Sequence, residues 1–137
     1  MKKGCFIIPV LLMSWIFLNG CAGSSSHFDL SGKWGGEHIG MVVYDSSATL
    51  EYDCARGTIN EPIKPDDNGE FEVTGKHVFE HGGPMRSDET PDEHPALYKG
   101  NIKGKEMTLI VIITDTQKEV GKFSVTLGAE ANIFKCL

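Results

Sequence analysis

From residue 32 onward, hydrophobic and polar residues alternate along the chain with a period of two, and no segment keeps a helical period. The clearest case is the segment 70–80, where Phe71, Val73 and Phe79 fall on one face and charged residues fall on the other. This alternation is typical of a strand that is buried on one side. The pattern therefore predicts an all-β protein.

Short turns divide the chain into eight extended runs. The strongest turn signal is Pro65-Asp66-Asp67-Asn68-Gly69, because Asn-Gly readily takes the positive backbone angles of a tight hairpin. The polar segment 81–95 contains three prolines and predicts a long, mobile loop. The runs expected to form strands are residues 34–44, 48–54, 58–63, 70–80, 96–102, 106–114, 120–127 and 131–136.

Eight short strands joined by hairpin-length connections favour a small antiparallel up-and-down β-barrel, because closure removes exposed sheet edges. A two-sheet β-sandwich is the alternative. The run 107–113 is apolar on both faces, so the loop, a neighbouring chain or a lipid surface must cover its outer side. Exposed Ile110 and Ile112 would mark a contact surface.

The amino-terminal region has the pattern of an export signal. Lys2 and Lys3 precede a nearly continuous apolar run over residues 6–18, which is short for a membrane span. The following Leu18-Asn19-Gly20-Cys21 resembles the lipobox of bacterial lipoproteins. That resemblance implies lipidation of Cys21 and a membrane partner through the lipid. Ala22, where some lipoproteins have aspartate, implies sorting to the outer membrane, facing the periplasm, in a host with two membranes.

These features divide the chain into three parts: a lipoprotein signal peptide at 1–20, a lipidated cysteine with a flexible tether at 21–31, and a β-barrel domain at 32–137. The predicted location is the cell envelope. A chain of 137 residues with 13 basic and 19 acidic residues has a formal net charge of −6. This acidity argues against a nucleic-acid partner, and the length allows one domain.

The cysteines predict one disulfide. Cys5 lies in the signal and Cys21 takes the lipid, which leaves Cys54 and Cys136 as a pair in an oxidising compartment. A disulfide between them would close a long loop and raise the free energy of unfolding by about 4 kcal/mol in the chain-entropy model. If both side chains point inward, the sulfurs meet inside one end of the barrel. A redox or metal-binding pair is the alternative, but no CxxC spacing supports it.

Two resemblances concern the fold. Gly32-Lys33-Trp34 is similar to the opening of lipocalins and avidin-like proteins, which implies that the tryptophan plugs one end of a barrel. Four further segments resemble the pattern of small bacterial envelope lipoproteins, a resemblance that implies no activity. They are Trp34-Gly35-Gly36-Glu37-His38, Asp53-Cys54-Ala55-Arg56-Gly57, Gly82-Gly83-Pro84 and Tyr98-Lys99-Gly100.

An eight-stranded barrel holds either packed side chains or one small ligand. If it holds a ligand, strand parity and aromatic character give the expected lining: Trp34, His38, Tyr52, His77, Phe79 and Tyr98. His38, His77 and His81, with Glu37, Asp53 or Glu80 nearby, are candidates for a zinc or copper site. No HxH or HExxH spacing supports that site, so the favoured interpretation is that His77 is a hydrogen-bonded core residue and that His38 and His81 lie near strand ends in water.

The sequence supports a catalytic site less well than a ligand-binding or metal-binding site. Glu51 and Asp53 lie two apart on one strand, but that face is expected to be solvated, and we predict no enzyme and no cofactor. The acidic loop residues Asp88, Glu89, Asp92 and Glu93 lie beside His94 and after Met85 and Arg86. They favour a solvated loop over a lid on the barrel mouth, a calcium site or a contact with a cationic partner. The predicted function is therefore a non-enzymatic, lipid-anchored envelope barrel that binds a small ligand or another envelope protein. A structural or protease-inhibitor-like module acting through its outer surface is the alternative, and a histidine-based metal-binding protein is the second.

Overall fold

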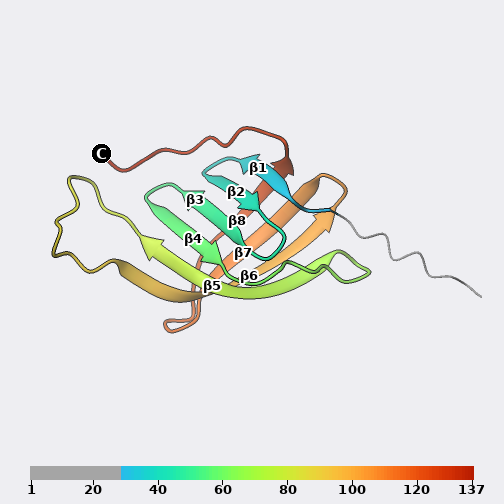
Figure 1. The fold of residues 1–137 in the computed structure, drawn as a ribbon, viewed down its shortest axis with the longest axis horizontal. Coiled ribbons are helices and arrows are strands. Elements are labelled where there is room, and N and C mark those ends of the chain that lie inside the picture. Colours follow the sequence, from blue (N-terminus) through green and yellow to red (C-terminus); the bar gives the residue numbers. More distant parts are fainter. Residues whose placement is uncertain (1–28) are drawn as a thin grey trace, which may run out of the picture.

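Eight strands follow one another around a closed antiparallel barrel, each hydrogen-bonded to the next, and the last strand pairs with the first (Figure 1). The computed structural model describes residues 29–137. The prediction of an all-β, eight-stranded up-and-down barrel is confirmed. The strands are β1 Gly32–Gly36, β2 Ile39–Val43, β3 Ala48–Tyr52, β4 Ala55–Ile59, β5 Glu70–Phe79, β6 Asp92–Lys103, β7 Glu106–Ile113 and β8 Lys118–Leu127.

The predicted number of strands is right, but the first and last predicted strands are wrong. The run 34–44 is two strands, because the chain turns back at Glu37 and His38. His38 takes a left-handed φ of 65°, which a non-glycine residue rarely adopts. The run 131–136 is not a strand of the barrel. It belongs to a C-terminal tail, residues 129–137, that lies outside the sheet.

The second and third predicted strands are displaced. The run 48–54 ends at Tyr52, and Cys54 turns the chain with a φ of 56°. Strand β4 begins at Ala55 and contains Gly57, which was expected to separate two strands. Strand β6 begins at Asp92, so the connection after β5 is shorter than predicted. We call this connection, residues 80–91, the long loop.

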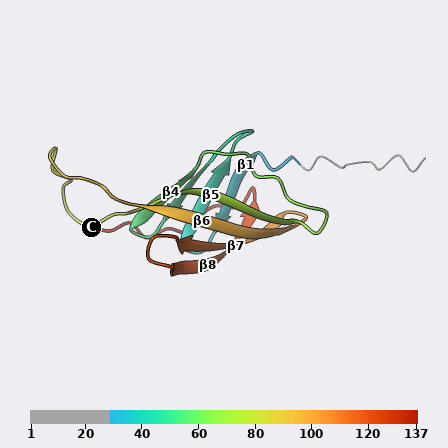
Figure 2. The same ribbon diagram turned by 90° about the horizontal axis from the view of Figure 1, so that it is seen from below.

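The barrel has two different ends. The β1–β2, β3–β4 and β7–β8 turns lie at the same end as the long loop, because the strands alternate in direction. We call this the loop end. The described chain enters β1 at the opposite end, and the long loop projects away from that entry point in both views (Figures 1 and 2).

Side chains fill the barrel interior. Trp34, Leu50, Tyr98 and Leu109 are each at most 1% exposed. The indole nitrogen of Trp34 donates to the carbonyl oxygen of Leu30 at 3.0 Å, so its buried polar atom is satisfied. The other large, fully buried side chains of the interior are Ile39, Met41, Ile59, His77, Met107, Val111, Ile113 and Val125.

Glycines on the inner face make room for aromatic rings. The Tyr98 ring lies against the bare backbones of Gly57 and Gly75, where any Cβ would meet it. Its hydroxyl donates to the carbonyl oxygen of Lys76 at 2.7 Å. Phe71 lies against Gly100 in the same way. This ring-on-glycine packing closes space that a ligand would otherwise occupy.

The outer side of β7 is covered by its own neighbours in the sheet. Ile110 and Ile112 are half-buried, and neither is among the exposed large hydrophobic residues of the described chain. Ile110 pairs laterally with Lys99 of β6 and Lys122 of β8, whose long aliphatic stems can flank it. The long loop does not provide this cover, because it contacts β4, where its Glu80 forms an ion pair with Arg56.

The C-terminal tail crosses the outside of the barrel toward the long loop (Figure 1). The backbone of Asn132 bonds with Gly36 and His38, at 3.0 and 2.7 Å. The predicted Cys54–Cys136 disulfide is confirmed, with a sequence separation of 82. The expectation that its sulfurs lie inside the barrel is wrong, because Cys54 sits in a turn and the exposed Cys136 belongs to the outer tail.

The predicted signal peptide, the lipidation site Cys21 and most of the tether lie outside the described residues. Within residues 29–137 no helix is long and apolar enough to cross a membrane.

Candidate functional site

The six residues expected to line a ligand site occupy three different environments. Trp34, Tyr52, His77 and Tyr98 are buried among the packed side chains of the interior. Phe79 is half-buried at the mouth of the loop end. The sixth, His38, is exposed in the β1–β2 turn, so the strand parity that placed it inside was wrong.

Two polar side chains, His77 and Tyr52, are buried inside the barrel near the loop end. His77 is fully buried, and neither of its ring nitrogens has a hydrogen-bond partner, nor does the hydroxyl of Tyr52. The imidazole packs against the rings of Tyr52 and Phe79, with centroids 5.2 and 4.7 Å away. Burial, and then the nearby charge of His94, lowers the pKa of His77. His77 is therefore a neutral core residue.

The two tyrosines of this interior are also held neutral. Burial raises the pKa of Tyr98 to about 12. Burial, and then the nearby Tyr98, raises the pKa of Tyr52 well above its usual value. Neither phenol can serve as a base near neutral pH.

His38 belongs instead to a contact between turns. Its Nδ1 lies 2.5 Å from a carboxylate oxygen of Asp53 in the β3–β4 turn. The other oxygen of Asp53 accepts the backbone N–H of Phe134 at 2.7 Å. That backbone bond, and then His38, lowers the pKa of Asp53. The contact joins two turns and the C-terminal tail, which is a structural role.

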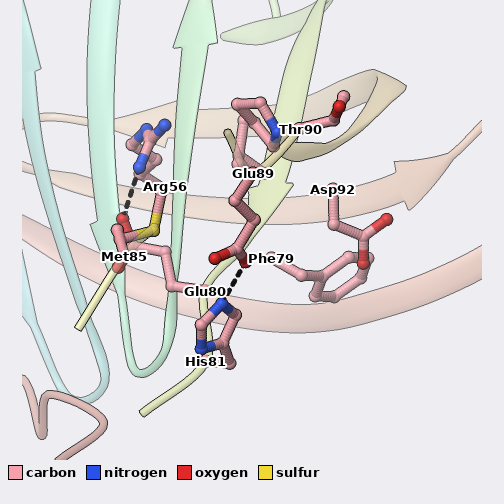
Figure 3. Close-up of a pocket in the computed structure, with 10 residues that line it drawn as sticks. Arg56, Phe79, Glu80, His81, Met85, Glu89, Thr90 and Asp92 are labelled. Carbon is pink, nitrogen blue, oxygen red and sulfur yellow. Dashed lines mark hydrogen bonds and ion pairs between the residues drawn. The ribbon is translucent and has the colours of Figure 1, made fainter. Parts of the chain in front are cut away.

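The long loop is held by hydrogen bonds between its own residues. His81 contacts the carboxylate of Glu89 (Figure 3). The same carboxylate accepts the backbone N–H of Arg86 at 3.3 Å. The Gly82 carbonyl, and then Glu89, raises the pKa of His81. His81, and then Arg86, lowers the pKa of Glu89. These directions favour an ion pair that closes the loop on itself.

A small pocket lies where the loop meets the outer face of β4 and β5 (Figure 3). Its volume is about 40 Å³, which suits a few water molecules rather than an organic ligand. Val78 points outward from β5 and is nevertheless only 7% exposed. Arg56 and Glu80 form an ion pair of 2.7 Å beside it. The other lining residues are Phe79, His81, Met85, Glu89, Thr90, Pro91 and Asp92.

His94 lies across the mouth of the barrel, between the long loop and the β7–β8 turn. It pairs across the strands with His77, and its ring centroid is 5.8 Å from that of Phe79. Its Nδ1 is 2.7 Å from Asp115 and its Nε2 is 3.0 Å from Asp92. Asp115, and then Asp92, raises the pKa of His94, and His94 lowers the pKa of Asp115.

The residues weighed for metal binding and hydrolysis do not converge. In the described part of the chain, no group of three or more His, Cys, Asp or Glu side chains could hold a metal ion. His81 is exposed in the loop, away from the interior series that it was expected to extend. Glu51 pairs with Lys135 at 3.3 Å, and Asp53 lies in a turn rather than on the same strand face.

Comparison of the chain with profiles of known protein families, with curated proteins and with solved structures finds no match. The sequence pattern did not predict Asp115 as a member of the loop end. Only the barrel topology brings Asp115 to His94, since 21 residues separate them.

Proposed function

We propose that the protein is a non-enzymatic, lipid-anchored component of the bacterial cell envelope that binds another envelope protein through the long loop. The observation that carries this proposal is the contrast between a filled interior and a projecting, internally bonded loop. Met85, in that loop, is 55% exposed although its side chain is large and apolar. A loop that is already ordered loses little entropy on binding, so it suits a recognition element.

The orientation of the barrel supports the same proposal. The expected anchor at Cys21 precedes β1 by about ten residues, the segment predicted from the sequence to be a tether. The described chain enters the barrel opposite the loop end (Figure 2). A barrel held to the membrane at its entry end would present the long loop away from the lipid, where a partner can reach it.

The filled interior favours a surface function over storage of a small ligand. A ligand inside the barrel would have to displace Tyr98 from Gly57 and Gly75, or break the packing of Trp34. Displacing well-packed core side chains costs several kcal/mol. The filled interior therefore supports another envelope protein, rather than a small ligand, as the binding partner.

Replacing the long loop tests this proposal. Phe79 and Asp92 are a cross-strand pair, so an Asn-Gly turn can join β5 to β6 in place of residues 80–91. A Tyr44→Ala variant is the control, because Tyr44 is 52% exposed at the opposite end. After gentle extraction from the envelope, we expect the wild type and the control to elute with the same companion protein and the loop-replaced barrel to elute alone. A loop-replaced barrel that folds and keeps the companion would contradict the proposal.

A further inference from the structure

Two histidines, His81 in the long loop and His94 just after it, have both ring nitrogens against hydrogen-bond acceptors. His94 faces Asp115 at 2.7 Å with Nδ1 and Asp92 at 3.0 Å with Nε2. His81 faces the Gly82 carbonyl oxygen at 2.9 Å with Nδ1 and the Glu89 carboxylate with Nε2. A neutral imidazole has one N–H and can donate only one of its two bonds. Both rings satisfy both partners only as imidazolium ions.

The other two histidines of the described chain differ in this respect. His38 contacts Asp53 through Nδ1, which a neutral ring with its proton on Nδ1 can do. His77 is buried without a partner on either nitrogen, which suits a neutral ring. Among the histidines of the described chain, the requirement for two ring protons is therefore specific to His81, near the start of the long loop, and His94, just after its end.

The contacts of the two imidazolium rings hold the long loop at its start and at its end. His81 ties the start of the loop to Glu89 near its end. His94 ties the first residues of β6, where the loop ends, to Asp115 in the β7–β8 turn. We propose that these contacts form a proton-operated clamp, in which His81 and His94 hold the long loop while protonated and release it when they lose a proton. The clamp itself rests on geometry, and its effect on partner binding rests on the proposed function.

Loss of a proton from His94 would leave a nitrogen lone pair facing a carboxylate. Asp92 and Asp115 would then lose the cation between them, so the start of β6 would be repelled from the turn. Two β5 residues also face His94: the ring of Phe79 and the neutral His77, whose pKa is lowered further by the charge of His94. The remaining nearby charges are engaged locally, Lys76 with Glu93 at 2.6 Å and Arg56 with Glu80 at 2.7 Å.

Around His81 the same change leaves one ring N–H for two acceptors and removes the charge attraction to Glu89, so the contact that closes the loop is weakened. Glu89 would keep the backbone N–H of Arg86 at 3.3 Å, while the Arg86 guanidinium lies 3.5 Å from Asp88. The pKa of His81 and that of His94 are both raised, which agrees with rings stabilised in their charged form. The clamp is therefore closed in mildly acidic solution and opens as the pH rises through these raised values, above the ordinary value of about 6.5.

Backbone relaxation measured by NMR tests the clamp without any partner. The protein, produced from its full chain and held in detergent micelles, is compared at pH 5.5 and pH 8. We expect order parameters of Gly83, Met85 and Ser87 to be near those of rigid backbone at pH 5.5 and to fall below about 0.6 at pH 8. His81→Gln and His94→Gln should each leave the loop disordered at both pH values. His38→Gln is the matched control and should keep the wild-type response.

A loop that is equally ordered at both pH values in the wild type would overturn the clamp, as would a normal pH response in the double variant H81Q/H94Q. The carbon and nitrogen shifts of the two imidazoles provide a second readout, because both rings must titrate above the ordinary value. These measurements are independent of the proposed function. If the loop loses order as the pH rises but the loop-replaced barrel keeps its companion, the clamp stands and the binding proposal fails. If the companion binds a loop that stays ordered at every pH, the binding proposal stands and the clamp fails.

Discussion

Gly35 of β1 and Gly40 of β2 face each other across the sheet, and the C-terminal tail lies on the bare backbone that they leave. A Cβ at Gly40 would come within 2.9 Å of the Cβ of Ala131, and one at Gly35 would meet the backbone of Glu130. The glycine pair is therefore a seat for the tail on the outer face of the barrel. Without it, the tail could not approach closely enough to bond with the β1–β2 turn.

A side chain at Gly40 should push the C-terminal tail away from the outer face of the barrel. We expect Gly40→Val to lower the free energy of unfolding by about 2 kcal/mol, because overpacking at a tight contact costs about 1–3 kcal/mol. The control is Val42→Leu, an outward position two residues along β2. Urea titration measures the difference. Equal stabilities for the two variants would show that the tail does not depend on the seat.

The disulfide should contribute more than any single contact of the tail. Cys136→Ser removes a link across a separation of 82 residues, and we expect it to cost about 4 kcal/mol in the free energy of unfolding. The barrel should persist, because β1 and β8 still pair through Trp34 and Leu127. Thermal unfolding with and without a dithiol reductant provides the measurement. The reductant should lower the melting temperature of the wild type and leave the variant unchanged.

The packing of Tyr98 against Gly57 predicts a coupling between the two positions. A Cβ at Gly57 would meet the Tyr98 hydroxyl, so Gly57→Ala alone should be strongly destabilising. Tyr98→Phe alone should cost about 1 kcal/mol, since it removes the bond to the Lys76 carbonyl. With the hydroxyl gone, the added methyl group has room, and the double variant should be more stable than the sum of the two losses predicts. Additive losses would contradict a filled interior at this point.

The buried His77 predicts a dependence of stability on pH. Because its pKa is lowered in the folded state, the unfolded chain binds its proton more readily, and folding loses stability as the pH falls below about 6.5. His77→Leu removes both this effect and two unpartnered polar atoms, so we expect it to be more stable than the wild type at pH 7. The advantage should grow between pH 7 and pH 5. An advantage that stays constant over this range would mean that His77 is not buried in its neutral form.

Much of the barrel could be predicted because its strands obey the period of two. Phe71, Val73 and Phe79 identify β5 to within one residue, and Asn68-Gly69 marks the hairpin before it. The β1–β2 turn could not be found this way, since Glu37 and His38 carry no turn signature and the strained φ of His38 appears only in the structure.

The loop end was harder to predict than the strands, because its contacts join residues that are distant along the chain. The parity that placed His77 inside was right, but the same parity failed for His38, which lies in an unrecognised turn. The pairing of His94 with Asp115 depends on the length of β6 beyond β7. The pattern predicts a strand in the tail because Phe134 and Cys136 satisfy the alternation, although Phe134 is 60% exposed.

Site-specific photo-crosslinking tests most directly whether the barrel works through its loop end. A photoreactive amino acid is placed at Met85 in one strain and at Tyr44 in another, two positions of similar exposure at opposite ends, 55% and 52%. Illumination of intact cells at mildly acidic pH should give one discrete adduct from position 85 and none from position 44. No adduct at position 85, or the same adduct from both positions, would contradict a binding function of the long loop.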